Sequence, residues 1–258
     1  MSALRAKCPD CRTLTAVAIG PDYQCHSCGR EFAAGLLRVP RAWGRSSGGR
    51  GGGRGGEEMA AAAAMDVPWP EAATIDEETL EEQIEATARE LPMRPLVLGG
   101  CCCSHVGAVR GLARRHGRVA VVWIDAHGDL NTPESSPSGN AWGMPLRMLI
   151  DAGDVSAHDV TLLGARNLDP PEVEFIAESR IRQRLGELPE FVYVALDCDV
   201  IDPQEADVWM PEPDGISLAE LEVLLAAIPR PAGAGFTGLK PSARNEVALA
   251  RLGHALGL

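Results

Sequence analysis

The stretch Val119-Ala-Val-Val-Trp-Ile-Asp125-Ala-His127-Gly-Asp129-Leu-Asn131-Thr-Pro133 joins an apolar run to three side chains of metal-binding type at every second residue. The apolar run is rich in Val and Ile and lies between glycines, which predicts a β-strand buried on both faces. Alternate residues at a strand end point the same way, so Asp125, His127 and Asp129 can converge on one point.

A second stretch, Phe191-Val-Tyr-Val-Ala-Leu-Asp197-Cys-Asp199-Val-Ile-Asp202-Pro203, repeats this pattern of an apolar strand that ends in carboxylates two residues apart. Together the two strand ends offer four carboxylates and one imidazole. Like charges this close repel one another unless a cation neutralises them. Hard oxygen ligands with one nitrogen suit Mn²⁺ or Mg²⁺. A single Asp-x-Asp is typical of a solvated turn, whereas two at two buried strand ends predict a metal site.

Strand and helix patterns alternate from Asp66 to the C-terminus. We expect strands near residues 94–100, 119–125, 160–164, 191–197 and 235–239, and helices near 76–91, 104–115, 144–152, 172–178, 217–228 and 242–256. An edge strand near residues 72–75 is the one strand signal that we find before Arg94. Single helices between strands predict right-handed crossovers and a parallel sheet, with ligands beyond the carboxyl ends of its strands.

Four cysteines near the N-terminus form two C-x2-C pairs, Cys8 with Cys11 and Cys25 with Cys28. Four thiolates in two tight knuckles predict a closed tetrahedral Zn²⁺ site, which replaces the hydrophobic core that so short a segment cannot build. A redox pair or four unrelated thiols is the alternative. The role of such a zinc ribbon stays open among nucleic-acid binding, protein contact and structural support.

A glycine- and arginine-rich segment, Gly44 to Gly56, follows the cysteines. This composition predicts a flexible linker, and its similarity to RNA-binding RGG segments leaves weak nucleic-acid contact through residues 1–56 as an alternative. An alanine-rich short helix is expected over residues 59–65. We therefore divide the chain into a zinc-ribbon-like module (residues 1–40), a Gly/Arg/Ala-rich linker (41–65) and an α/β domain (66–258).

Composition narrows the class of protein. Apolar residues make up 45% of the chain and aromatic ones 4%, so the core should be aliphatic. The net charge of −12 argues against nucleic acid as the main partner of the whole chain. Neither a membrane-spanning apolar run nor a hydrophobic leader is evident, so we expect a cytoplasmic protein that does not contact membranes. Its eight cysteines are then expected to be ligands, thiols or core residues.

The two acidic stretches resemble those of the arginase, agmatinase and formiminoglutamase family, the ureohydrolases. The resemblance covers Leu96 to the C-terminus, in the family's order: a Gly-Gly turn (99–100), D-A-H-G-D-L-N-T-P (125–133), S-G-N (138–140) and L-D-C-D-V-I-D-P (196–203). It implies a three-layer α/β/α sandwich with a mostly parallel, arginase-like sheet, here preceded by the small zinc ribbon.

The resemblance also implies a site with one or two divalent ions, Mn²⁺ by the family pattern. Asp125 and Asp197 would bridge the ions, Asp129 would bind one of them, and His127 with Asp199 the other. Water activated by the metals would attack a planar C–N carbon, so Asp125, His127 and Asp199 form the expected catalytic set. Asn131 and Asn140 match positions that hold the polar tail of the substrate in some relatives.

Three departures from the family pattern fall on the chemistry. Cys102 stands where relatives carry a His ligand, which leaves three outcomes open: a site that prefers Zn²⁺ or Fe²⁺, a ligand role for His105, or loss of that ion. Trp142 replaces a proton-transferring His. Gly238 stands where relatives carry an acid that pairs with a guanidinium group. These changes argue against arginine or agmatine as the substrate.

We interpret the chain as a metal-dependent hydrolase of a non-peptide C–N bond in a small molecule. One alternative enzyme would use a nucleophilic thiol of Cys101 to Cys103, at a helix N-terminus, together with His105. The other alternative is a pseudoenzyme that binds nucleic acid or a protein partner through residues 1–56. The α/β domain is short on its N-terminal side, which leaves room for contacts between copies in a homo-oligomer.

Overall fold

A parallel sheet of seven strands forms the centre of the computed structural model, which describes residues 5–6, 8, 11, 13, 15–19, 22–33, 35–44, 59, 62–69 and 71–257. The strand order is β6-β5-β7-β11-β10-β8-β9, and every neighbouring pair is parallel. The strands are β5 (Gly35–Val39), β6 (Glu71–Thr74), β7 (Pro95–Gly99), β8 (Ala120–Ile124), β9 (Val160–Leu163), β10 (Val192–Asp197) and β11 (Gly233–Thr237).

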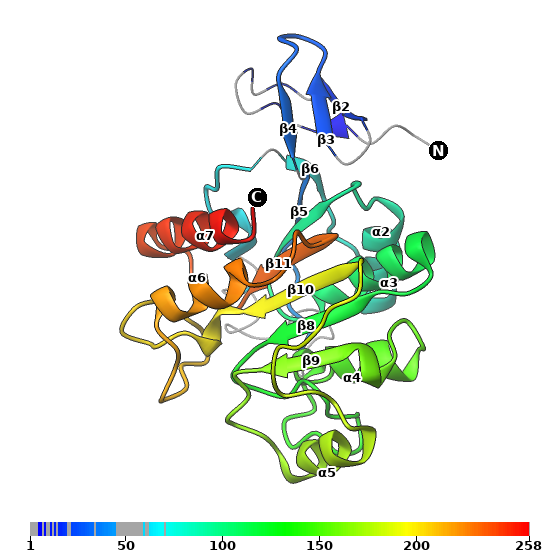
Figure 1. Ribbon diagram of the computed structural model, residues 1–258, viewed down its shortest axis with the longest axis vertical. Helices are drawn as coiled ribbons and strands as arrows, with labels where there is room; N and C mark the ends of the chain where they lie inside the picture. Colours follow the sequence, from blue (N-terminus) through cyan, green and yellow to red (C-terminus); the bar gives the residue numbers. More distant parts are fainter. Residues whose placement is uncertain are drawn as a thin grey trace.

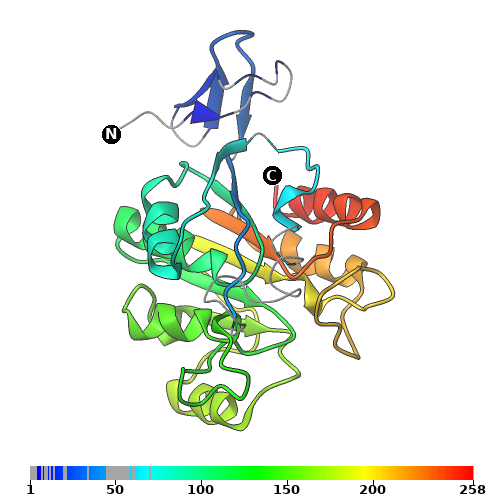
Figure 2. The same cartoon turned by 180° about the vertical axis from the view of Figure 1, so that it is seen from behind.

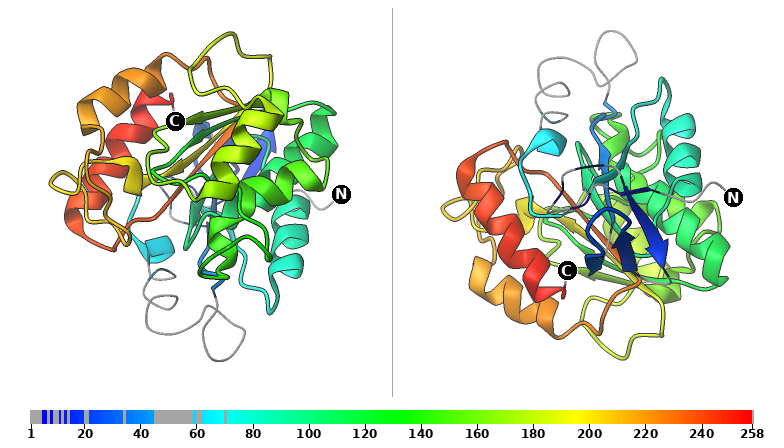
Figure 3. Two further views of the ribbon diagram at one scale, coloured as in Figure 1. Left: turned by 90° about the horizontal axis from the view of Figure 1, so that it is seen from below. Right: turned by 90° about the horizontal axis from the view of Figure 1, so that it is seen from above.

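Helices cover both faces of this sheet (Figure 1). The helices of one face are α2 (Leu80–Arg89), α3 (Ser104–His116), α4 (Pro145–Asp151) and α5 (Pro170–Ser179), and those of the other are α6 (Leu218–Ala226) and α7 (Ala243–Ala255). Seen from below, the red and orange helices α7 and α6 lie on one side of the strands and the green helices on the other (Figure 3). The predicted three-layer α/β/α sandwich is therefore confirmed.

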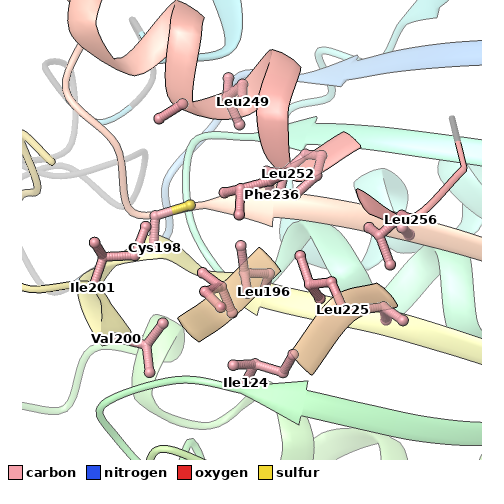
Figure 4. Packing of buried hydrophobic residues seen from close by; sticks show 14 of the residues in the cluster. Ile124, Leu196, Cys198, Val200, Ile201, Leu225, Phe236, Leu249, Leu252 and Leu256 are labelled. Carbon is pink, nitrogen blue, oxygen red and sulfur yellow. The ribbon is translucent and has the colours of Figure 1, made fainter. Parts of the chain in front are cut away.

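The core consists of two apolar layers, one on each face of the sheet. Leu196 and Phe236 pack against Leu225 of α6 and Leu249 of α7 (Figure 4). Successive residues of a strand point to opposite faces, so each buried strand contributes to both layers. In β8, for example, Val122 and Ile124 belong to the α6–α7 layer, whereas Val121 and Trp123 belong to the other. This two-sided burial explains why the strands are continuous apolar runs.

Side chains that cap helix N-termini fix where several helices begin. Thr79, Ser217 and Ser242 each accept a hydrogen bond from a backbone N–H of the first turn of α2, α6 and α7. Asp169 and Glu172 form a reciprocal capping box at the start of α5. These caps satisfy N–H groups that have no partner within the helix.

A small antiparallel sheet lies at the N-terminal end, next to edge strand β6 (Figures 1 and 2). Its strands are β1 (Arg5–Ala6), β2 (Ala16–Ile19), β3 (Asp22–Cys25) and β4 (Glu31–Ala33). Ala72 of β6 packs against its interior, and Arg230 lies 3.5 Å from Asp22. The small sheet is thus attached to the larger one by packing and by an ion pair.

Strand β5 corrects the expected division of the chain. Residues 35–39, which we assigned to the N-terminal module of residues 1–40, pair with β7 and β6 in the central sheet. Leu36, Leu37 and Val39 are fully buried there. Five residues followed by Pro40 give too short a pattern to separate from the neighbouring ribbon. The strand near residues 72–75 is confirmed as the edge strand β6.

Two further expectations concern the segment before β6. Residues 45–58 of the expected Gly/Arg linker lie outside the described residues, so the linker stays a prediction. Of the alanine-rich helix expected over 59–65, the described part forms one short 3-10 helix, η1 (Ala62–Ala64).

No candidate membrane-spanning helix is found in the described part of the chain, where the longest helices, α3 and α7, have 13 residues each.

Candidate metal centre

A pocket of about 160 Å³ opens beyond the carboxyl ends of the central strands. Residues after β7, β10 and β8 line its floor. The connection from β7 to β8 runs over one face of the sheet, and the connection from β10 to β11 runs over the opposite face. The strand order therefore reverses between β7 and β8, where the pocket lies. Open parallel sheets bind ligands at such a reversal.

The acidic side chains of the two predicted stretches meet on the pocket floor. Backbone N–H groups hold one oxygen of each of three carboxylates: Asp125 Oδ1 accepts from His127 at 2.7 Å, Asp197 Oδ1 from Asp199 at 2.9 Å, and Asp199 Oδ1 from Ala126 at 3.1 Å. The turns that follow β8 and β10 therefore orient their own ligands.

Asp129 stands apart in this group. Its backbone is left-handed, with φ at 53°, a conformation that Asp tolerates better than most residues. Its Oδ2 is buried and has no hydrogen-bond partner. A buried carboxylate oxygen without a partner is costly, so this oxygen is placed as a ligand would be.

The candidate ligands form two groups that share one residue. Cys102, Asp125 and Asp129 make one group, and Asp125, His127 and Asp199 make the other; within each, the candidate ligand atoms lie within 4.8 Å of one another. Asp125 therefore lies between two ion positions. Asp197 belongs to neither group but also lies on the floor. Its Oδ2 accepts from Cys102 at 2.8 Å and from Thr237 at 3.1 Å.

The protonation of the site fits a cation-binding role. Burial, and then the charge of Asp199, raises the pKa of Asp197 to about 7. Burial and Asp125 raise the pKa of Asp199 to about 6. Burial also raises the pKa of Asp125 and, together with the charge of Asp125, holds that of Asp129 well above its usual range. Ionisation of these groups is opposed as long as no cation is near, and a divalent cation would remove that opposition.

His127 balances part of this charge. Burial lowers its pKa, but hydrogen bonds and charge from Asp125 and Asp199 outweigh burial and raise the pKa to about 12. Its Nδ1 lies 2.9 Å from Asp199 Oδ2, and its Nε2 lies 3.4 Å from Glu212 Oε1. Carboxylate oxygens thus lie beside both ring nitrogens of His127.

His105 is not a ligand in this arrangement, which settles one of the three outcomes left open by Cys102. The ring is fully buried below the floor, with Nδ1 3.0 Å from the hydroxyl of Tyr193 and Nε2 3.4 Å from Thr237 Oγ1. Burial lowers its pKa to about 3. His105 therefore supports Thr237, which in turn contacts Cys102 at 3.2 Å.

The alternative of a nucleophilic cysteine receives mixed support. Burial opposes ionisation of the Cys101 thiol, but hydrogen bonds with Cys103 and with the backbone of Trp43 outweigh burial and lower its pKa. Burial and the charge of Asp197 raise the pKa of Cys102 well above its usual range, so the nearby carboxylates outweigh the helix N-terminus. The Cys101 thiol lies 3.8 Å from the carbonyl oxygen of Arg41, not beside an imidazole. Cys198, expected in the core, is fully buried in the α6–α7 layer.

The walls of the pocket are polar and acidic. Asn131 lines the wall as expected, and its Nδ2 donates to Asp169 at 2.8 Å. Asn140 is not part of the lining, although its neighbours Ser138 and Trp142 are. The lining as a whole consists of Met59, Cys101, Cys102, Asp125, His127, Asp129, Asn131, Ser136, Ser138, Trp142, Gly143, Asn167, Asp169, Glu172, Asp197, Asp199 and Met210.

Sequence reasoning missed three acidic residues near the site: Asp169, Glu172 and Glu212. Glu172 is buried and accepts from the backbone N–H of Leu130 at 2.9 Å, which ties the start of α5 to the turn after β8. The capping box of Asp169 and Glu172 is visible in the sequence and could have placed both residues at a helix N-terminus. Nothing in the sequence pattern indicates that Glu212 reaches His127.

Gly238 follows β11 at the edge of the floor. Its φ is +78°, and a Cβ atom there would collide with Asp197 Oδ1. The backbone therefore accounts for the glycine at a position where relatives carry an acid, because an acidic side chain at 238 would displace the candidate ligand Asp197.

The four N-terminal cysteines also meet in space. Cys8, Cys11, Cys25 and Cys28 place their sulfur atoms within 4.8 Å of one another in the small sheet.

Comparison with known proteins gives concordant matches. The sequence model of the arginase family matches residues 29–184. The chain is 32% identical over 220 residues to the arginase of Bacillus caldovelox, covering 68% of this chain and 74% of that protein. It is 36% identical over 158 residues to the arginase of Bacillus subtilis strain 168, covering 49% of this chain and only 53% of that relative. The crystal structure of a Bacillus subtilis arginase superposes with a TM-score of 0.73 at 26% identity, covering 86% of this chain and 97% of that one.

Proposed function

The chain belongs to the arginase family of hydrolases, and from this premise we propose that it uses a divalent metal centre to hydrolyse a non-peptide C–N bond of a small molecule. One observation carries the proposal: two groups of candidate ligands share Asp125 on the floor of the pocket, and Asp129 Oδ2 has no hydrogen-bond partner among the described residues.

The residues present fit a centre of two ions. Cys102 and Asp129 would hold one ion and His127 and Asp199 the other, and Asp125 would serve both. Asp197, beside Cys102, would complete the set as the family resemblance implies. Divalent ions bound at these positions supply Lewis-acid activation of water near neutral pH. Manganese is the metal that the family pattern suggests, and the thiol of Cys102 leaves zinc or iron as the competing choice.

The chain's own residues orient this centre. Glu212, beside Nε2 of His127, holds the ring so that Nδ1 faces Asp199. Glu172 fixes the turn that carries Asp129 through the N–H of Leu130. Mutations of such supporting residues reduce metal affinity or activity without removing a ligand.

The pocket wall favours a substrate with a positively charged or N–H-rich tail. Asp169 and Glu172 lie in the lining together with the hydroxyls of Ser136 and Ser138, and the residues of the lining include neither Lys nor Arg. Asn131 would contact the same tail. The alternative of a binding protein without enzymatic activity does not explain why acidic side chains gather on the floor of the pocket.

We further propose that arginine and agmatine are not the substrates. The backbone at Gly238 leaves no room for the side chain of an acid that would pair with a guanidinium group. Trp142 in the pocket lining cannot transfer a proton as His does. Amidine, formimino and ureido compounds are the classes to compare with guanidines.

Metal content and hydrolysis together test the proposal. The protein is produced in medium that contains Mn, Fe and Zn, as wild type, as Asp125→Ala/Asp197→Ala and as the control Asp202→Asn. Asp202 belongs to the second stretch but lies outside both ligand groups, and its side chain accepts from the N–H of Gln204, so its variant should keep all ions. We expect the double variant to lose one or two ions per chain and all release of ammonia or urea from a panel of amidine, formimino, ureido and guanidine compounds.

Equal metal content in wild type and double variant contradicts the metal centre. Bound ions without turnover of any compound favour the binding-protein alternative, and salt-sensitive binding of nucleic acid that requires residues 1–56 would establish it. Efficient urea release from arginine leaves the hydrolase proposal standing and overturns the exclusion of guanidines.

A further inference from the structure

The sulfur atoms of the small sheet are spaced as in a tetrahedral metal site. Cys8 Sγ and Cys28 Sγ are 3.7 Å apart, and all four sulfur atoms lie within 4.8 Å of one another. With zinc–sulfur bonds of about 2.3 Å, tetrahedral geometry separates neighbouring sulfurs by about 3.8 Å. A disulfide would need about 2.05 Å, and all four thiols are free.

Polar groups around the sulfurs support thiolates at this place. The backbone N–H of Cys11 lies 3.4 Å from Cys8 Sγ, and the hydroxyl of Thr15 lies 3.3 Å from Cys25 Sγ. Donors of this kind orient and stabilise the ligands of metal sites.

The small sheet has little else to hold it together. Among the residues that the structure describes there, the buried ones are Cys8, Ala16, Tyr23 and Cys25, two of which are cysteines of the cluster. An interior of this size cannot offset the loss of chain entropy on folding, and small domains of this kind need a metal or disulfides. The antiparallel strands therefore depend on the sulfur cluster.

The cysteine cluster lies next to an edge of the central sheet. Strand β6 is an edge strand, paired with β5 alone, and its Ala72 packs against the interior that contains Cys8 and Cys25. Edge strands expose unpaired backbone groups and are usually covered. All four cysteines also precede residue 29, where the match to the arginase family begins, so the feature is additional to the family's domain.

We propose that Cys8, Cys11, Cys25 and Cys28 bind one structural Zn²⁺, and that this ion holds the small sheet as a cover over edge strand β6 of the catalytic sheet. The ion has no part in hydrolysis, because the cysteines lie outside the pocket lining.

The zinc is counted in the Asp125→Ala/Asp197→Ala background, in which the candidate catalytic ions are absent. We expect one zinc per chain there, and none after addition of Cys11→Ser/Cys28→Ser. Cys103→Ala, which removes a buried thiol outside both metal groups, is the control and should keep the zinc. Zinc that is missing from the background protein, or that persists in the serine variant, overturns the metal assignment.

Two measurements on the full chain remain informative even if the serine variant folds poorly. Cobalt introduced in place of zinc should show the near-ultraviolet sulfur-to-cobalt charge transfer of a four-thiolate site, and its absence contradicts the assignment. Hydrogen exchange at the β6 amides (Glu71–Thr74) should accelerate at least severalfold when zinc is removed by chelation from the aspartate double variant. Unchanged exchange contradicts the covering role. Neither result depends on hydrolysis, so this proposal and the proposed function can fail separately.

Discussion

Cys102 places a soft sulfur atom among the harder oxygen and nitrogen atoms of the pocket floor. Its thiol donates to Asp197 at 2.8 Å and lies in one of the two ligand groups, while its pKa is held well above the usual range by burial and by Asp197. A metal would have to displace this proton, which makes ion binding at this position sensitive to the thiophilicity of the ion.

Cys102→His should therefore change the metal preference of the centre. After loading of metal-free protein with equal Mn²⁺ and Zn²⁺, we expect the ratio of manganese to zinc in the centre to rise severalfold, because imidazole is a harder ligand than thiolate. Elemental analysis in the Cys11→Ser/Cys28→Ser background avoids counting zinc at the N-terminus. Cys103→Ala serves as the control, and an unchanged ratio in the histidine variant would show that Cys102 does not bind the ion.

At this scale the sequence predicted which side chains of metal-binding type gather in the pocket: Asp125, His127, Asp129, Asp197 and Asp199 all line it. The expected alternation along an extended strand end is not the reason, because Asp129 has a left-handed backbone and Asp199 lies in a 3-10 helix, η4 (Cys198–Val200). The acidic residues that support the site could not be predicted from the sequence. Glu212 approaches His127 from a loop more than 80 residues away, and no local pattern encodes such a contact.

Helices α2 and α3 are joined by charges as well as by apolar contacts. Glu85 of α2 accepts hydrogen bonds from Arg110 and Arg114 of α3, and Arg110 also donates to Asp154. Hydrogen bonds from Arg114, opposed by burial and reinforced by Arg110, lower the pKa of Glu85 to about 2. Because Glu85 and Arg114 are well exposed, water screens their interaction and limits its contribution to below about 1 kcal/mol.

Glu85→Gln should lower stability by a pH-dependent amount. The pKa of Glu85 is depressed in the folded state, so its stabilisation is present above the unfolded value of 4.5 and is lost as pH falls towards about 2. We expect the thermal midpoint to fall by about 2 °C to 4 °C at most at pH 7 and to match that of wild type near pH 2 to 3. Glu77→Gln, which changes a half-buried acid just before α2, is the control. An equal effect of both variants would contradict the specific role of Glu85.

Element positions were predicted well where a hydrophobic run or cap defined them. The helices expected over 104–115 and 242–256 appear as α3 and α7, and Thr79 and Ser217 mark the starts of their helices. Strand β5 was missed because its five residues follow the ribbon without a break. Its identity as a sheet strand depends on pairing with β7, which comes more than 50 residues later.

The described part of the molecule consists of a seven-stranded sheet and a small antiparallel sheet that lies next to its β6 edge. Alternating strands and helices were enough to predict the parallel direction of the sheet, whereas the three layers were implied by the resemblance to the arginase family. The strand order β6-β5-β7-β11-β10-β8-β9 was not predictable, because it depends on which crossovers bury the most apolar surface together.

Deletion of residues 1–33 should separate these two parts. The remaining chain keeps β5 and the pocket floor, so we expect hydrolysis within about twofold of wild type, a lower thermal midpoint, and self-association detectable by sedimentation because the β6 edge is exposed. Arg230→Ala, which removes only the contact with Asp22, is the control and should remain unassociated. Loss of hydrolysis with an intact fold would instead assign the small sheet a part in catalysis.

The chain separations within the two sulfur-containing clusters impose an order of assembly during synthesis. Cys8 and Cys28 are 20 residues apart, whereas Cys102 must meet Asp197, 95 residues later, and Thr237, 135 residues later. Short loops close early and at small entropic cost, while long ones wait for the rest of the sheet. The N-terminal cluster can thus close while the chain is still emerging from the ribosome. The pocket floor cannot form until β11 has been made, so a nascent chain has no complete catalytic centre with which to compete for scarce metal.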